Sequence, residues 1–104
     1  MFGFKDFLET RKRGRSLPET GYKNSYAIIF RAASADESLL RGNNEYVTMS
    51  RKFAKEHADH QIAVYDEPFI AFRYMVKASD VYEASNPGEY FYGGPPVEGK
   101  PIRV

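Results

Sequence analysis

The clearest pattern of hydrophobic and polar positions lies between Asn44 and Ala58. Mostly apolar or small side chains recur there at the i, i+3, i+4, i+7 spacing that places them on one face of an α-helix. The positions on this face are Tyr46, Met49, Ser50, Phe53, Ala54 and His57. Asn43 or Asn44 can cap the first turn, because an Asn side chain accepts a hydrogen bond from an unpaired amide. The pattern predicts an amphipathic helix that packs on a sheet.

Two apolar runs flank this helix and predict strands. Tyr26 to Phe30 is aromatic and β-branched without charge, which is typical of a strand buried on both faces at the centre of a sheet. Gln61 to Tyr65 is the second run, and Asp66-Glu67-Pro68 separates it from the alternating run Phe69 to Lys77. Because a turn is the simplest connection between neighbouring strands, the last two runs predict an antiparallel hairpin.

Weaker signals occur on both sides of these elements. Ser34 and Glu37 form a Ser-x-x-Glu capping box and Gly42 can end a helix, so a two-turn helix is expected between Ser34 and Gly42. A further helical turn is expected at 80–84 and a short strand at 89–92.

The two ends of the chain have a different character. An apolar stripe predicts a short helix from Phe4 to Arg13, and the Pro, Gly and Ser content of residues 15–24 indicates a linker. From Gly93 to Val104 there are three prolines and three glycines, which favours an extended tail. We therefore expect an arm and linker at 1–24, a body at 25–92 and a tail at 93–104.

The order of elements predicts an α+β fold. It consists of a small, mainly antiparallel sheet covered on one face by helices, built from a strand, a helix pair, a hairpin, and a short helix and strand. With the last two weak elements, the order is that of the ferredoxin-like β-α-β-β-α-β arrangement. A chain of 104 residues suffices for one hydrophobic core.

Composition narrows the environment in which the protein is expected to act. The chain has no cysteine, which excludes disulfides and thiolate-bound metals and fits a reducing cytoplasm. No apolar run approaches the ~20 residues that span a bilayer, so no membrane association is expected. The formal net charge is only +1, so the chain as a whole has no strong attraction to nucleic acid.

One cluster has the chemistry of a metal site. His57 and His60 lie three positions apart at the predicted helix end, between Glu56 and Asp59. A site needs a third ligand, however, and His57 can instead complete the apolar face of the helix. We expect no metal and no cofactor. No established catalytic motif is present, so an enzyme centred on the two histidines is the weakest of three functional hypotheses.

The densest positive charge lies in the arm. Residues 1–23 hold six basic and three acidic side chains, a net charge of +3. The candidate contacts to a partner protein or to phosphates are Arg11, Lys12, Arg13 and Arg15. A run of this kind is also typical of a solvated helix end, where cations oppose the helix dipole.

Aromatic and basic residues also alternate on a predicted strand. Phe72, Arg73 and Tyr74 could form a surface on which nucleic-acid bases stack. The alternative is that the aromatic residues form one face of a hydrophobic core, since aromatic residues are favoured in strands.

One pentapeptide matches a known processing signal. Leu17 to Gly21 has the sequence that sortases cleave, but no membrane-spanning run follows it, and we interpret the match as coincidental.

By elimination, the leading hypothesis is a small cytoplasmic binding or regulatory protein that acts without catalysis through a protein–protein surface. Its general character is that of the accessory proteins of phages and mobile elements. The alternative is a nucleic-acid-binding module that uses the basic arm and the aromatic strand. The sequence also leaves open whether the chain forms a homo-oligomer.

Overall fold

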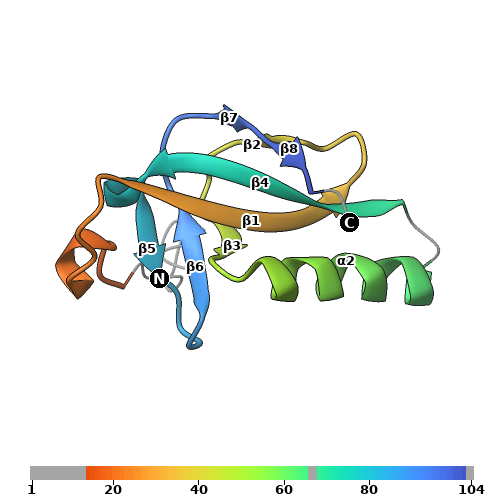
Figure 1. The fold of residues 1–104 in the computed structure, drawn as a ribbon, viewed down its shortest axis with the longest axis horizontal. Coiled ribbons are helices and arrows are strands. Elements are labelled where there is room, and N and C mark those ends of the chain that lie inside the picture. Colours follow the sequence, from red (N-terminus) through yellow and green to blue (C-terminus); the bar gives the residue numbers. More distant parts are fainter. Residues whose placement is uncertain (1–13, 66–67, 103–104) are drawn as a thin grey trace, which may run out of the picture.

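The computed structural model of the chain describes residues 14–65 and 68–102, which form a curled six-stranded sheet, one α-helix and a small two-stranded sheet (Figure 1). The strands are β1 (Tyr26–Ser34), β2 (Leu39–Leu40), β3 (Glu45–Thr48), β4 (Phe69–Lys77), β5 (Val81–Glu83), β6 (Glu89–Tyr92), β7 (Val97–Glu98) and β8 (Lys100–Pro101). The helix is α2 (Arg51–Tyr65), and two 3-10 turns are η1 (Pro18–Thr20) and η2 (Ala78–Asp80).

A long ribbon of β1 and β4 organises the larger sheet. The two strands pair antiparallel along their whole length, from Tyr26 opposite Lys77 to Ser34 opposite Phe69. The strand order is β5-β6-β3-β1-β4-β8, and β2 pairs with β7 separately. The prediction that Tyr26 to Phe30 forms a central strand is confirmed, and the strand continues to Ser34 because its partner is equally long. The predicted burial on both faces is wrong, because Tyr26 and Ile28 are exposed.

The ribbon has one face that is buried along its length and one that is covered only in part. Ala27 and Ile29 alternate with exposed Tyr26 and Ile28, as the two-residue period of a strand requires. The core on the first face comprises Leu17, Ala27, Ile29, Ala33, Leu40, Val47, Phe72, Tyr74, Val76, Ala78, Val81 and Tyr92. On the second face, α2 packs on the ribbon, and a smaller cluster joins Phe30, Ala54 and Ala71 to Ile102. Every strand pairing in the described residues is antiparallel, so the α+β prediction is confirmed at this level.

The helix begins later than the hydrophobic pattern predicts. Residues 45–48 form β3, which pairs along its length with β6. Asn44 has a positive φ of 55°, a left-handed conformation that a helix cannot contain. The cap is Ser50, whose hydroxyl oxygen accepts a hydrogen bond of 3.1 Å from the Phe53 amide. The start predicted at Asn44 and the Asn cap are therefore wrong.

The buried side of α2 also differs from the predicted one. Ala54 and Ala58, four positions apart, are buried, whereas Phe53 and His57 are exposed. Small side chains allow the helix to approach the ribbon closely, and the bulky Phe53 is displaced to the flank.

Gln61 to Tyr65 forms the end of α2 and not a strand, so the predicted hairpin is absent. Periodicity alone cannot distinguish a short apolar run in a helix from one in a strand. β4 pairs instead with β1 over nine positions and with β8 over two.

The second helix of the predicted pair is likewise absent. Ser34 ends β1, and the Ser34 hydroxyl donates to the Asp36 carboxylate at 2.8 Å within a turn. β2 follows this turn. The described residues contain one α-helix, so the helix pair and the ferredoxin-like order are not found. The helical turn expected at 80–84 is wrong, because β5 (Val81–Glu83) occupies these positions and the 3-10 turn η2 lies before it. The strand predicted at 89–92 is confirmed as β6.

Both flanking segments take part in the body. Leu17 is only 3% exposed and donates its amide to the Val81 carbonyl at 2.9 Å, so residues 14–17 lie along the edge of β5. At the other end, β7 and β8 pair with β2 and β4. The predicted helix from Phe4 to Arg13 lies outside the described residues. Within the described ranges, no helix is long and apolar enough to cross a membrane.

Candidate binding groove

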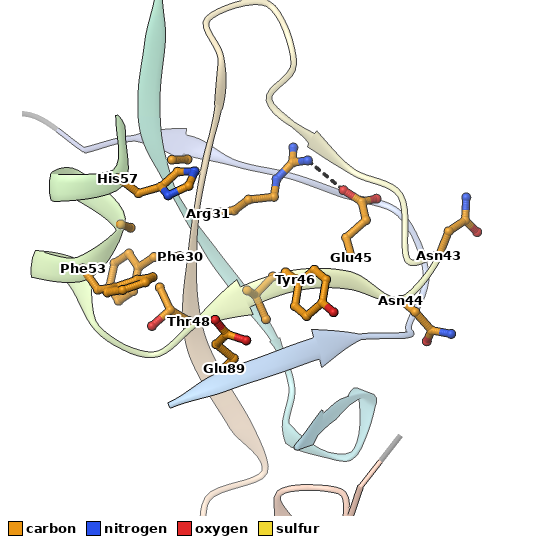
Figure 2. Close-up of a pocket in the computed structure, with 13 residues that line it drawn as sticks. Phe30, Arg31, Asn43, Asn44, Glu45, Tyr46, Thr48, Phe53, His57 and Glu89 are labelled. Carbon is orange, nitrogen blue, oxygen red and sulfur yellow. Dashed lines mark hydrogen bonds and ion pairs between the residues drawn. The ribbon is translucent and has the colours of Figure 1, made fainter. Parts of the chain in front are cut away.

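A groove of about 710 Å³ opens between β1, β3 and the first turns of α2 (Figure 2). It is lined by Phe30, Arg31, Ala32, Asn43, Asn44, Glu45, Tyr46, Val47, Thr48, Phe53, Ala54, His57 and Glu89. These residues come from four separate elements and one turn, which the strand pairing and helix packing bring together. We call this site the β3–α2 groove.

The walls of the β3–α2 groove carry exposed aromatic rings. Phe53 is 51% exposed and Tyr46 is 52% exposed, although both are large apolar side chains. The Tyr46 ring packs on Phe91, its cross-strand partner in β6, with 4.7 Å between ring centroids. This contact holds Tyr46 in place and leaves its other face open to the groove.

Polar groups line the remaining edge of the groove. Asn43 and Asn44 form the turn that leads into β3, and Figure 2 shows both at the far end from the helix. Thr48 is buried, and its hydroxyl accepts a hydrogen bond of 3.0 Å from the Ser50 amide. Glu89 accepts one of 3.1 Å from the Asn86 side chain. The groove thus combines an apolar wall with hydrogen-bonding groups.

An ion pair beside the groove fixes the start of β3. Arg31 Nη1 lies 2.7 Å from Glu45 Oε2, and both side chains are largely buried. Arg31 also donates to the carbonyls of Glu37 and Leu39 at 2.7 and 3.0 Å and to the Tyr74 hydroxyl at 3.2 Å. One guanidinium therefore ties the connection between β1 and β3 to the core, and the groove wall is preformed.

The charge of the lining follows from this arrangement. Two carboxylates, those of Glu45 and Glu89, line the groove beside one guanidinium, that of Arg31. Since Arg31 is bound to Glu45, the lining as a whole is slightly acidic at neutral pH.

The histidine pair is separated by the geometry of the helix. His57 lines the β3–α2 groove, whereas His60 lies on α2 outside it, and both are exposed. Across residues 14–65 and 68–102, no group of three His, Cys, Asp or Glu side chains could hold a metal ion.

Of the four basic residues predicted to contact a partner, only Arg15 lies in the part of the chain that the structure describes. Arg15 forms an exposed ion pair with Glu83 at 3.3 Å on the edge of β5. Arg11, Lys12 and Arg13 lie outside the described residues.

The predicted aromatic strand is divided between two faces. Phe72 and Tyr74 are each 1% exposed on the core face of β4, and Arg73 is exposed on the opposite face. The three side chains therefore do not share one surface.

Sequence reasoning did not anticipate the groove, because it placed Tyr46 and Phe53 on one buried helix face. A signal was present in the Asn43-Asn44 pair, which is typical of a turn, followed by the strand-forming residues 46–48. Glu89 had no local signal at all, because only the pairing of β6 with β3 brings it to this site.

Comparisons with protein-family models, with curated proteins and with solved structures find no match to this chain. The chemistry of the groove itself is therefore the basis for a functional proposal.

Proposed function

We propose that this chain is a small non-catalytic binding protein that seats a segment of a partner protein in the β3–α2 groove. The observation that carries the proposal is the half-exposure of Phe53 and Tyr46 on a preformed wall. Apolar surface removed from water contributes about 25 cal/mol per Å², so covering these rings favours association. Aromatic residues are also enriched among the side chains that dominate binding energy at protein interfaces.

The openness of the groove favours a protein segment over a small molecule. A small-molecule site buries roughly 70–90% of its ligand. Here two aromatic wall residues, Phe53 and Tyr46, remain more than half exposed, so a small ligand would also remain open to solvent. A partner chain that continues beyond the groove covers both rings.

The lining indicates the chemistry of that segment. The aromatic wall fits one bulky apolar side chain, and the slightly acidic lining favours an adjacent basic side chain over an acidic one. Asn43 lies at the groove end, where its side-chain amide can bond to a partner backbone. On this proposal the protein acts in the cytoplasm as a regulatory accessory protein by occupying its partner's surface.

The test is affinity capture from nuclease-treated lysate of the source cells, followed by calorimetry with the purified partner. Phe53→Ser and Tyr46→Ser should each weaken binding by at least about tenfold, as expected for aromatic anchors. The matched control is Ile62→Ser, because Ile62 is an exposed apolar residue of α2 outside the groove.

Binding that survives both groove variants would place the interface elsewhere and refute the proposal. Capture of the chain by itself, lost in Phe53→Ser, would identify the partner as a second copy.

A further inference from the structure

One end of the β1–β4 ribbon has an exposed face that α2 does not cover. In Figure 1, α2 runs below the right part of the ribbon, towards its Ser34 and Phe69 end. At the opposite end, Tyr26 is 57% exposed, Met75 58% and Ile28 37%. Tyr26 pairs with Lys77 and Ile28 pairs with Met75, so these side chains project from the same face. We call this surface the open ribbon face.

Three cations border these apolar side chains. Arg73 and Lys77 alternate with the buried residues of β4, and Lys100 of β8 lies directly opposite Arg73. All three cations are exposed, and none forms an ion pair with any residue of the described ranges. Neither β1 nor β4 contains an Asp or a Glu. The face therefore presents positive charge that no carboxylate of its own two strands neutralises.

A small cavity lies at the end of this face. It has a volume of about 310 Å³ and is lined by Pro18, Asn24, Ser25, Tyr26, Lys77, Ala78 and Ser79. Tyr26 and Lys77 belong both to the open ribbon face and to this cavity, which makes the two continuous. A ligand that extends along β4 from Arg73 to Lys77 therefore reaches this cavity beside the Tyr26 ring.

We propose that the open ribbon face binds single-stranded nucleic acid. Proteins that hold single strands combine cations along the phosphate backbone with aromatic side chains on which bases stack. Arg73, Lys77 and Lys100 supply the cations, while Tyr26 and Met75 supply the apolar contact. A duplex hides the faces of its bases, whereas a single strand leaves them free to stack on the Tyr26 ring. This site shares no residue with the β3–α2 groove, although Arg73 lies opposite Phe30 of the groove lining, and the proposal does not depend on the occupant of the groove.

The experiment uses the full-length chain and fluorescently labelled oligothymidylate and oligouridylate of about 12 nucleotides, with fluorescence anisotropy as the readout. The double variant Arg73→Glu, Lys77→Glu should weaken binding by at least about tenfold, and Tyr26→Ser by about tenfold. The logarithm of the binding constant should fall against the logarithm of salt concentration with a slope of about −2, since each phosphate contact on a single strand contributes about −0.7. The control is Lys52→Glu, because Lys52 is an exposed cation on α2 outside the open ribbon face, and this variant should bind within about twofold of the parent chain.

Three outcomes would overturn the proposal. One is absence of binding at low salt, and another is equal affinity for a duplex or for polyglutamate. The third is binding that survives the double variant but is lost when Arg11, Lys12 and Arg13 are changed to Gln, because the arm would then be the binding site. Unchanged circular dichroism and melting temperature of each variant would show that a loss of affinity is not a loss of folding.

Discussion

At the scale of single residues, Arg31 shows how one side chain can stabilise the connection between β1 and β3. Its guanidinium joins Glu45, two backbone carbonyls and the Tyr74 hydroxyl, and it lies 5.9 Å from the centre of the Tyr74 ring. Nε is buried without a hydrogen-bond partner in the described part of the chain. The remaining bonds must offset this cost, so the network is sensitive to the loss of any one member.

Replacing Arg31 by Met should lower the free energy of unfolding by about 2–3 kcal/mol, because Glu45 is left largely buried without its cation. The measurement is urea denaturation. Arg41→Met provides the comparison, since Arg41 forms an exposed pair with Glu37 and its loss should cost less than about 1 kcal/mol. Equal losses in the two variants would show that the Arg31 network does not stabilise the loop.

Two buried tyrosines link stability to alkaline pH. Burial raises the pKa of Tyr74 above its ordinary 10.0, although the hydrogen bond from Arg31 partly opposes this effect. Burial, assisted by the charge of Asp80, also raises the pKa of Tyr92. The folded state therefore favours the neutral phenol, so this contribution to stability is complete below pH 10 and is lost as pH rises through the raised pKa values.

Urea denaturation at a series of pH values should therefore show that the contribution of these tyrosines to the free energy of unfolding is constant below about pH 10 and declines above it. Tyr74→Phe should make the decline shallower, because one titrating group is removed. The same variant should have a lower free energy of unfolding at neutral pH, because the hydrogen bond from the Tyr74 hydroxyl to the Ser38 carbonyl is lost. An identical alkaline decline in Tyr74→Phe would refute the assignment.

At the scale of elements, α2 is held by small residues and not by its bulky ones. Ala54 and Ala58 meet the ribbon, whereas Phe53 stands beside it in the groove. The helix follows β3 without a long connection, and Ser50 caps it within the short link between them. The pairing of β3 with β6 thus determines where the helix can begin.

The helix packing predicts an unusual order of mutational effects. Ala58→Asp should destabilise the protein by more than about 3 kcal/mol, since it places a charge in a closely packed contact. Phe53→Ala should cost only about 1 kcal/mol, because the ring is half exposed and leaves no closed cavity. Thermal denaturation of both variants tests this order, and a larger effect at Phe53 would mean that the ring is buried in solution.

At the scale of the whole molecule, the chain closes one core with segments that are far apart in sequence. Leu17, the β1–β4 ribbon and Tyr92 meet in the same cluster, and β7 pairs with β2. The segment at 14–17 extends the sheet beyond β5 and protects that edge. Of the five residues that match a sortase signal, Leu17 is buried in the core, whereas residues 18–21 are exposed.

Amide hydrogen exchange should follow this architecture. The slowest amides are expected in β1, because it is hydrogen-bonded on both sides and lies at the centre of the sheet, and the fastest strand amides in the two-residue strands β2 and β7. Mass spectrometry or NMR can resolve these segments. Faster exchange in β1 than in β7 would contradict the strand order.

The sequence alone was sufficient to predict the features that depend on local composition. The apolar β-branched run from Tyr26 to Phe30 indicated a central strand, and Glu89 to Tyr92 indicated a short one. The antiparallel α+β class followed from the alternation of such runs with a helical pattern. These predictions succeeded because neighbouring side chains carry the relevant signal.

Tertiary structure decided the rest, since burial depends on residues far along the chain. Residues 45–48 became a strand because β6 offered them a partner, and this moved the start of the helix to Arg51. Phe53 and Tyr46 were thereby left at a groove wall, and Phe72 and Tyr74 were enclosed by elements from both ends of the chain. No local period specifies such contacts, because they form only when the long-range pairings of the sheet are complete.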